Sequence, residues 1–377
     1  MKKAYYIDSF SIGHVHEMFD ASSLEMFSHN YDKIEYRSSI SSKNNVEKIM
    51  GILPSSVRYK RILIPRKVDK IGLVLRQIVA TVYNFLYVVF KSRQYDIIIN
   101  YNTLLSIYPV KFACKFASHK VFIICHGELK ELELHSNVNC LTKKSLDFFI
   151  KKGNNIPRNL YFFTLSKSIN ENVSKLVTPQ IAEKFCYFYH SAIFKQTVNK
   201  KERKLYKKII GMTGSLRESK GFMDFLAIAS HFKSNQNVEF RAIGALKTDV
   251  NIIKESGVVL PECVKEDTFL SREEMYTEIS KLDYVLYLFP PEIYKYTASG
   301  SVYDAIDCEV PIIALRNDFF NDLFEYCGKF GFLFDTKEDI VDFIEKLDTI
   351  DEKIDFRNIK EKLSPKQVSS LLTKQNL

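Results

Sequence analysis

Residues 211–222, GMTGSLRESKGF, carry the pattern from which the architecture of this chain can be worked out. They follow the β-branched pair Ile209 and Ile210 and precede apolar residues spaced three and four apart, so we predict a strand, a glycine-containing turn and a helix over residues 221–233. Such a junction directs backbone N–H groups and a positive helix end toward an anion. Arg217 and Lys220 add positive charge, which suits a diphosphate. The alternative is an ordinary strand–helix turn with solvated basic residues.

The same alternation of strand and helix patterns continues through both halves of the chain. Short β-branched or aromatic runs separated by helical periods are typical of repeated βαβ units around parallel sheets. The predicted strands span residues 4–7, 34–37, 61–64, 96–100, 121–125 and 161–165 in the first half, and residues 209–212, 239–243, 284–288, 312–315 and 331–334 in the second. The predicted fold is therefore α/β, with two Rossmann-like doubly wound domains facing a central cleft where ligands bind.

Length and composition favour the same two-domain organisation. A chain of 377 residues exceeds what one hydrophobic core usually organises. The lysine-rich segment at residues 199–208 contains no glycine and little apolar surface, so it is interpreted as a linker. We place the first domain at residues 1–198 and the second at residues 209–363. A tail at residues 364–377 could form a helix that packs back on the first domain.

The charge distribution indicates an anionic partner. Lys and Arg number 54 against 45 Asp and Glu, and the basic residues concentrate at residues 60–76 and 195–208. A diphosphate or a lipid surface fits this pattern. Nucleic acid is not expected, because no aromatic-interleaved basic stretch or zinc-finger spacing accompanies the charge. Seven scattered cysteines without a CxxC pair favour reduced thiols and a cytoplasmic location.

Two apolar features bear on the relation to membranes. The N-terminal stretch turns polar at Asp8 before an apolar run long enough for a signal peptide, so export is not expected. Residues 71–90 are strongly apolar but are interrupted by Arg76, Gln77 and Asn84. We interpret them as a buried helix that covers a parallel sheet, in preference to a helix in contact with a membrane.

A second candidate anion site lies at residues 294–315, YKYTASGSVYDAIDCEVPIIAL. Small and hydroxyl residues at positions 297–301 precede an apolar-periodic run, so we expect them to cap a helix. Asp304 would lie one turn inside this helix, within reach of a ribose hydroxyl. The alternative is an ordinary serine-capped helix that leads into a buried strand.

Together these two segments resemble the donor-binding half of the GT-B glycosyltransferases, particularly the large retaining family four. The Lys-Gly pair of that family corresponds to Lys220 and Gly221. Its later elements correspond to FRAIG at residues 240–244, FLSREEMYTEISKLDYVLYLFP at residues 269–290 and DAIDCEVPII at residues 304–313. Order and spacing agree over residues 209–316. The chain departs from the family at three positions. Ser215 stands where the family has an arginine, Tyr296 stands where it has the first glutamate of a pair, and Asp304 replaces the second glutamate.

The resemblance implies a hexosyltransferase that uses a UDP or GDP sugar without a metal ion or other cofactor. Because family four retains the configuration at the anomeric carbon, the resemblance also implies a retaining enzyme. The Asp-x-Asp triplet of metal-dependent enzymes of the other major fold does not occur. Residues 1–198 would take a saccharide or lipid-linked acceptor of bacterial capsule or O-antigen assembly at the cytoplasmic membrane face, and residues 209–363 would hold the donor. The candidate donor-binding residues are Gly13, Gly214, Ser215, Arg217, Lys220, Ser271, Tyr296, Ser299, Gly300, Ser301 and Asp304.

Candidate catalytic residues lie in the first half, in VFIICHGELKELE at residues 121–133. His126 and Glu128 follow a strong apolar strand. The resemblance implies that this His contacts the transferring sugar, and Glu128 could act as a base for an acceptor hydroxyl. A structural role is the alternative for a lone His at a strand end. His14 and His16, after the first strand, have the spacing of metal ligands, but no third ligand is near in sequence, so no metal site is expected.

Two other functions remain open from the sequence. The sugar-nucleotide 2-epimerases share this two-domain fold and act on the donor alone. A catalytically degenerate, partner-binding relative of the transferases is the second alternative, because Tyr296 stands where the family has an acidic residue.

Overall fold

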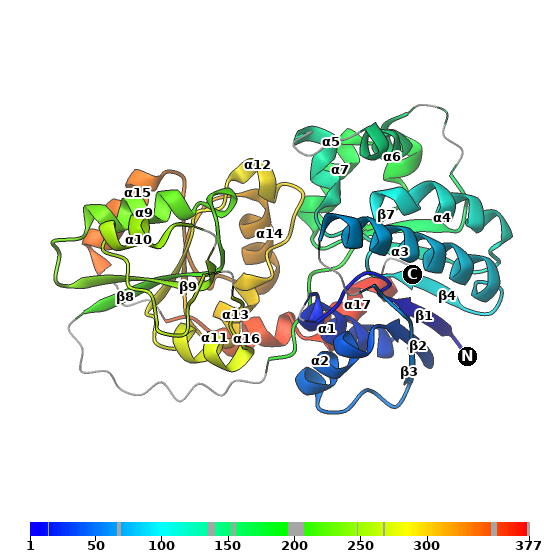
Figure 1. Ribbon diagram of the computed structural model, residues 1–377, viewed down its shortest axis with the longest axis horizontal. Helices are drawn as coiled ribbons and strands as arrows, with labels where there is room; N and C mark the ends of the chain where they lie inside the picture. Colours follow the sequence, from blue (N-terminus) through cyan, green and yellow to red (C-terminus); the bar gives the residue numbers. More distant parts are fainter. Residues whose placement is uncertain are drawn as a thin grey trace. The chain divides into compact units, whose positions relative to one another are not determined.

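The computed structural model describes residues 1–13, 15–65, 69–134, 140–151, 153, 156–194, 207–246, 248–266, 268–347 and 353–374. The chain forms two compact units (Figure 1). The first comprises Met1–Ile193, Tyr296–Ala298 and Leu363–Leu377, and the second Phe194–Lys295 and Ser299–Lys362. His14 and most of the expected linker lie outside the described residues.

The first unit is built on a seven-stranded parallel sheet in the order β3-β2-β1-β4-β5-β6-β7. Its central strands are buried along their whole length, as expected where helices cover both faces of a parallel sheet. The strands are β1 (Lys3–Ile7), β2 (Lys33–Ser38), β3 (Val57–Arg61), β4 (Asp96–Ile99), β5 (Val121–Ile124), β6 (Leu160–Thr164) and β7 (Phe185–Tyr187). The helices are α1 (Glu17–Ser28), α2 (Ile40–Met50), α3 (Lys70–Lys91), α4 (Ile107–Ala113), α5 (Glu131–Leu134), α6 (Cys140–Ile150), α7 (Lys167–Leu176), α8 (Pro179–Ala182) and α17 (Pro365–Lys374).

The second unit contains a five-stranded parallel sheet in the order β12-β11-β10-β8-β9. Its strands are β8 (Lys208–Leu216), β9 (Val238–Leu246), β10 (Tyr284–Tyr287), β11 (Ile312–Leu315) and β12 (Gly331–Phe334). Its helices are α9 (Phe222–His231), α10 (Val250–Glu255), α11 (Arg272–Ile279), α12 (Pro291–Tyr294), α13 (Ser301–Asp307), α14 (Asp318–Cys327), α15 (Lys337–Glu345) and α16 (Phe356–Lys362).

Each sheet has one point at which the strand order reverses direction. In the first unit this point lies between β1 and β4, and in the second between β8 and β10. The loops that leave the carboxyl ends of such a strand pair run to opposite faces of the sheet and leave a crevice for a ligand. The two switch points are therefore the places where functional residues are to be sought.

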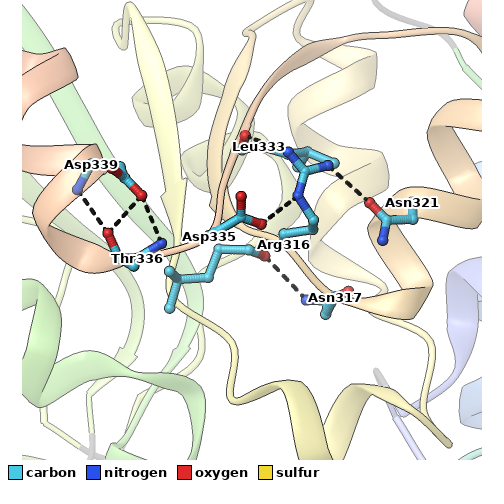
Figure 2. A network of polar contacts seen from close by, with 8 residues as sticks. Arg316, Asn317, Asn321, Leu333, Asp335, Thr336 and Asp339 are labelled. Atoms are coloured by element: carbon cyan, nitrogen blue, oxygen red, sulfur yellow. Dashed lines mark hydrogen bonds and ion pairs between the residues drawn. The ribbon is translucent and has the colours of Figure 1, made fainter.

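A network beyond β11 and β12 ties the carboxyl edge of the second sheet together (Figure 2). Arg316 donates from Nε to Asp335 Oδ1 at 2.7 Å, from Nη2 to the Leu333 carbonyl at 3.1 Å and from Nη1 to Asn321 Oδ1 at 3.3 Å. Thr336 and Asp339 then form the capping box that begins α15. One guanidinium thus holds the ends of both strands and the start of α14.

Near the C-terminus, Pro365–Lys374 form α17, which belongs to the first unit and packs against α1. Asn30 Nδ2 donates to the Ser369 carbonyl at 3.4 Å and to Thr373 Oγ1 at 3.2 Å. This helix lies next to the N-terminal elements although more than 300 residues of chain separate them.

The structure differs from two of the sequence expectations for strands. The strand predicted at residues 61–64 is misplaced, because β3 ends at Arg61 and Leu63 beyond it is 65% exposed. β3 is an edge strand with the largely polar sequence VRYKR, so the more apolar residues that follow it attracted the prediction. β7 was not predicted, since three residues are too few to show an alternating pattern.

The apolar segment at residues 71–90 is α3, and its interpretation as a buried helix is wrong. The residues that face the protein recur every four positions and are at most 5% exposed: Arg76, Ala80, Asn84 and Val88. The residues offset from them by two positions lie on the opposite face and are 40 to 67% exposed: Val74, Ile78, Val82, Leu86 and Phe90. Arg76 and Asn84, two of the three polar residues that interrupt the apolar run, thus lie on the face that binds the helix to the protein. Within the described part of the chain, Ile71–Lys91 is also the one segment long and apolar enough to cross a membrane by length and composition.

Candidate functional site

The turn that follows β8 is shaped by a glycine. Residues Glu218–Lys220 form a single 3-10 turn, and Gly221 then adopts φ 80° before α9 begins. A Cβ on Gly221 would lie 2.1 Å from the carbonyl oxygen of Leu288, at the end of β10. The backbone of this turn therefore touches the backbone beyond β10, and only glycine permits both the φ value and the approach.

Lys220 is held beside this turn by two aromatic rings. Its ammonium group donates to the hydroxyl of Tyr294 and lies 4.8 Å from the Tyr294 ring centroid and 5.1 Å from that of Phe289. The two rings are stacked with centroids 4.1 Å apart. Burial raises the pKa of Tyr294, so its hydroxyl stays protonated at neutral pH. The positive charge is thus positioned by cation–π contacts and a neutral hydrogen-bond partner.

Gly214 and Ser301 lie side by side in the second unit, but Gly214 is part of β8, not of the expected turn, and Ser301 is the first residue of α13. A Cβ on Gly214 would come within 3.2 Å of the Ser301 Cβ. Tyr287 of β10 connects them, because its hydroxyl lies 3.1 Å from Thr213 Oγ1 and donates to the Ser301 carbonyl at 2.8 Å. The juxtaposition lies at the switch point between β8 and β10.

The expectation that hydroxyl residues cap α13 is wrong. The N-cap is Gly300, and no side chain accepts a hydrogen bond from the first turn. The Ser299 and Ser301 hydroxyls lie 3.1 Å from each other instead. With seven residues, α13 is also too short to contribute a large helix dipole. The charge that an anion would meet here therefore comes mainly from side chains.

The polar candidate residues Asp304, Ser271, Arg217 and Ser215 have their side chains engaged in hydrogen bonds within the second unit. Asp304 is buried in α13 and accepts a hydrogen bond from Arg272 Nη1 at 2.6 Å. Ser271 is the N-cap of α11 and forms a capping box with Glu274. Arg217 is exposed, and its Nε donates to Ser215 Oγ at 2.7 Å. Arg272 was missed in the sequence because nothing local links it to a residue 32 positions away.

The Asp304–Arg272 pair supports a stability prediction. We expect Asp304→Asn to lower the free energy of unfolding by about 1 to 2 kcal/mol, because the charged hydrogen bond is lost in a largely buried position. The matched control is Asp335→Asn, which breaks an ion pair whose two side chains are 44% and 74% exposed and should change stability by less than about 0.5 kcal/mol. Thermal denaturation of both variants measures the difference. Equal shifts would contradict the assignment of Asp304 as a buried charged partner.

His126 follows β5 and contacts Asn100, which lies at the switch point of the first unit. Its Nε2 atom donates to the Asn100 carbonyl at 2.8 Å and lies 3.1 Å from Asn100 Oδ1, just beyond β4. Its ring stacks on the His16 ring with centroids 4.3 Å apart. Burial, followed by the proximity of His16, holds the pKa of His126 well below its usual range. His126 is therefore neutral at physiological pH and donates from Nε2.

Glu128 is turned back on its own loop. Its Oε2 atom accepts the backbone N–H groups of His126 at 2.9 Å and of Gly127 at 3.0 Å. Burial raises the pKa of Glu128, and these N–H contacts oppose the shift. A Glu128 carboxylate that acts as a base for another molecule therefore also holds its own loop in place through these two N–H groups.

Sequence reasoning missed a buried carboxyl group behind His126. Asn100 Nδ2 donates to Asp20 Oδ1 at 2.6 Å, and the Tyr6 and Tyr36 hydroxyls donate to Asp20 at 2.9 and 3.3 Å. Burial, together with the nearby carboxylate of Asp8, raises the pKa of Asp20 well above its usual range. The signal that could have found this set is the position of Asp8 and Asn100 directly after the two strands that flank the switch point.

The remaining candidates are distributed between the two units. Tyr296 belongs to the first unit, where it is 5% exposed in the hydrophobic core and donates to the Glu133 carboxylate. Ser299, Gly300 and Ser301 belong to the second unit. Gly13 lies in the first unit with φ 65°, and its N–H donates to Ser41 Oγ at 3.2 Å. The structure thus brings Gly214, Ser299 and Ser301 together within the second unit, whereas Tyr296 and Gly13 belong to the first.

No protein-family model and no curated protein matches the sequence. Among solved structures, the lipopolysaccharide outer core galactosyltransferase WaaB is similar over 100% of both chains, with a TM-score of 0.62 and 14% identity. Anabaena HepE in complex with UDP and glucose is similar over 100% of this chain and 95% of its own, with a TM-score of 0.58 and 14% identity.

The chain has the GT-B fold. A putative UDP-N-acetylglucosamine 2-epimerase from Listeria monocytogenes is also similar, over 100% of this chain and 97% of its own, with a TM-score of 0.53 and 14% identity. The GT-B fold is thus common to proteins that are named for different reactions, and the function must be argued from the site. Among the residues that the structure describes, no three His, Cys, Asp or Glu side chains are grouped so that they could hold a metal ion.

Proposed function

We propose that this chain is a glycosyltransferase that moves a sugar from a UDP or GDP donor to a saccharide or lipid-linked acceptor. What supports the proposal is the second unit's switch point, where Lys220 is fixed by two aromatic rings and Gly214 of β8 lies against Ser301 of α13. The solved structure of HepE, which has the same fold, is in complex with UDP and glucose, and this supports a nucleotide-sugar donor.

In the proposed mechanism, the second unit stabilises the leaving diphosphate. Negative charge grows on the diphosphate oxygens as the C–O bond to the sugar breaks, and a fixed cation stabilises that charge without reorganisation. The Lys220 ammonium would supply this charge, with Arg217 as an exposed second cation. The backbone at Gly214 and the hydroxyls of Ser215, Ser299 and Ser301 would contact the donor. No metal ion takes part in this proposal, because these groups carry the charge stabilisation.

The first unit would orient the sugar and the acceptor. The neutral His126 ring presents Nδ1 or its edge to a ligand while Nε2 is held by Asn100. Glu128 would accept the proton of an acceptor hydroxyl. In the second unit, Asp304 together with Arg272 would hold the ribose of the donor. The acceptor would be an intermediate of bacterial surface polysaccharide assembly at the cytoplasmic membrane face, and WaaB, which has the same fold, is named for transfer to the lipopolysaccharide outer core.

A sugar-nucleotide 2-epimerase is the second candidate, since the putative epimerase from Listeria monocytogenes has the same fold. The two reactions differ in what they need. A transferase releases nucleoside diphosphate in proportion to added acceptor. An epimerase acts on the donor with no acceptor present.

The test combines binding and turnover. We expect UDP or GDP to raise the melting temperature, because a ligand that binds only the folded state stabilises it by mass action. Nucleotide release from the matching sugar donor should then require an acceptor from a panel of saccharides and lipid-linked sugars. A melting temperature unchanged by every nucleotide would contradict the proposal. Conversion of the donor sugar without acceptor would establish the epimerase, and binding without any turnover would indicate the degenerate, partner-binding relative.

A further inference from the structure

We propose that the outer face of α3 is a membrane-docking surface that lies flat in the interface of an anionic bilayer. The surface comprises Val74, Ile78, Val82, Leu86 and Phe90 of α3 and Phe112 and Phe116 next to it. The inference goes beyond the transfer reaction and does not depend on it, because all of its residues belong to the first unit and none lies at a switch point.

The outer face of α3 is apolar over its whole length. Its five residues recur every four positions, on the side of the helix opposite the stripe that faces the protein, and they are 40 to 67% exposed. Ile71, near the start of the helix, is 79% exposed. A contiguous apolar stripe of this length is unusual on a surface that stays in water, and it indicates an interaction site.

Aromatic residues extend this surface beyond α3. α4 and the short turn after it, Cys114–Phe116, pack beside α3, and both Phe112 and Phe116 are 51% exposed. The ring of Phe112 stacks on that of Phe85 in α3 with centroids 6.5 Å apart. On the other side, Leu63 and Ile64 border an open apolar groove of about 580 Å³ against α3. The apolar surface is therefore wider than a single helix.

Polar contacts hold the opposite face of α3 against the protein. Ser9 Oγ donates to Asn84 Oδ1 at 2.9 Å, and Asn84 is fully buried. Arg76 donates from Nε to the Pro65 carbonyl at 3.2 Å and lies over the Phe10 ring at 5.4 Å. A helix that spans a bilayer would have to leave these contacts and place Arg76 and Asn84 in hydrocarbon. If α3 instead keeps one face against the protein and places its apolar face in the lipid interface, the polar contacts are kept and the apolar side chains leave water.

The charge of the surrounding segment selects an anionic membrane as the occupant. Residues 58–93 contain nine Lys and Arg and a single acidic residue, Asp69. Lys70 begins α3, Lys91 ends it, and the exposed Arg93 follows, while Lys115 lies over the Phe112 ring at 5.4 Å. Basic residues around an apolar face are typical of helices that bind anionic lipid surfaces. A second copy of the chain would bring the same basic segment against itself, which disfavours self-association.

The chain contains no tryptophan, so one introduced residue reports on this surface alone. We expect the emission of Phe90→Trp to shift to the blue and to be quenched by brominated lipid when vesicles are added in which about one lipid in three is phosphatidylglycerol. The response should fall strongly in high salt and with pure phosphatidylcholine. The matched control is Phe269→Trp, at a 75% exposed position in the second unit, which should not respond.

A second pair of variants tests the apolar contribution. In the Phe90→Trp background, Ile78→Gln with Val82→Gln should weaken partitioning onto these vesicles by about tenfold or more. Met223→Gln with Ile252→Gln, both at 43% exposed positions in the second unit, should leave it unchanged. The proposal is overturned if Phe90→Trp fails to respond to any vesicle, or if both reporters respond alike. It is also overturned if the chain dimerises without binding vesicles and the Ile78 and Val82 substitutions abolish the dimer.

Discussion

Replacing Lys220 with alanine is expected to lower donor turnover by about 100- to 1000-fold, the usual effect of removing one fixed group that stabilises developing negative charge. The ammonium is positioned by the Tyr294 hydroxyl and by the stacked rings of Phe289 and Tyr294. Alanine removes the charge and leaves this aromatic pair in place. The rise in melting temperature with UDP or GDP should shrink in the same variant, and should disappear when Arg217→Ala is added.

A control separates this effect from a general loss of positive charge. Lys233→Ala removes an exposed ammonium that donates to the Glu255 carbonyl at 3.0 Å, beyond the C-terminal end of α9. We expect this variant to keep both turnover and the nucleotide response. Initial rates of nucleotide release and thermal denaturation with and without nucleotide provide the two measurements. Full turnover in Lys220→Ala would remove the central support for the proposed donor site.

Replacing Gly221 with alanine is expected to destabilise the second unit by about 3 to 5 kcal/mol. A left-handed φ of 80° accounts for about 1 to 2 kcal/mol of this with an alanine side chain. The remainder comes from the overlap of the new Cβ with the Leu288 carbonyl oxygen at 2.1 Å, which forces the turn after β8 away from β10. Because Lys220 precedes this residue, nucleotide binding should be lost even where the variant remains folded.

Gly257→Ala is the matched control for this steric effect. Gly257 has the same φ of 80°, but its Cβ would meet a flexible neighbour, Lys233 Cγ, at 3.1 Å. We therefore expect only the conformational part, about 1 to 2 kcal/mol, and an unchanged response to nucleotide. Thermal denaturation of both variants gives the comparison. Similar losses of stability would show that the contact between Gly221 and Leu288 is less tight than the structure indicates.

Much of the fold was predictable from local pattern. The runs at residues 284–288 and 312–315 are apolar and bounded by turn residues, and both became buried central strands. The strand that leads to Gly221, the lysine before it and the helix after it were found for a similar reason, whereas the turn expected at Gly214 was wrong because β8 continues to Leu216. A strand, a left-handed glycine and a helix are each specified by residues that are neighbours in the chain.

The candidate site in the first unit was only partly accessible in this way. His126 and Glu128 were found because they follow a strong strand. Their partners were not, because the strand order of the sheet brings Asn100, just beyond β4, to His126, and Asp20 of α1 in turn contacts Asn100. Likewise, Arg272 meets Asp304 only after α11 and α13 have packed together.

The composition of residues 71–90 predicted an apolar helix, and its polar interruptions were visible in the sequence. Which face of that helix meets the protein depended on where Ser9 and the Pro65 carbonyl lie once the sheet has formed, since they hold Asn84 and Arg76 inward. Tyr296 shows the same limit, because its position in the first unit's core follows from contacts between segments far apart in the chain. Local pattern determines which elements form, because backbone conformation and periodicity depend on neighbouring residues. The burial of each face and the partner of each polar group depend on contacts distant in sequence, which only the folded chain makes.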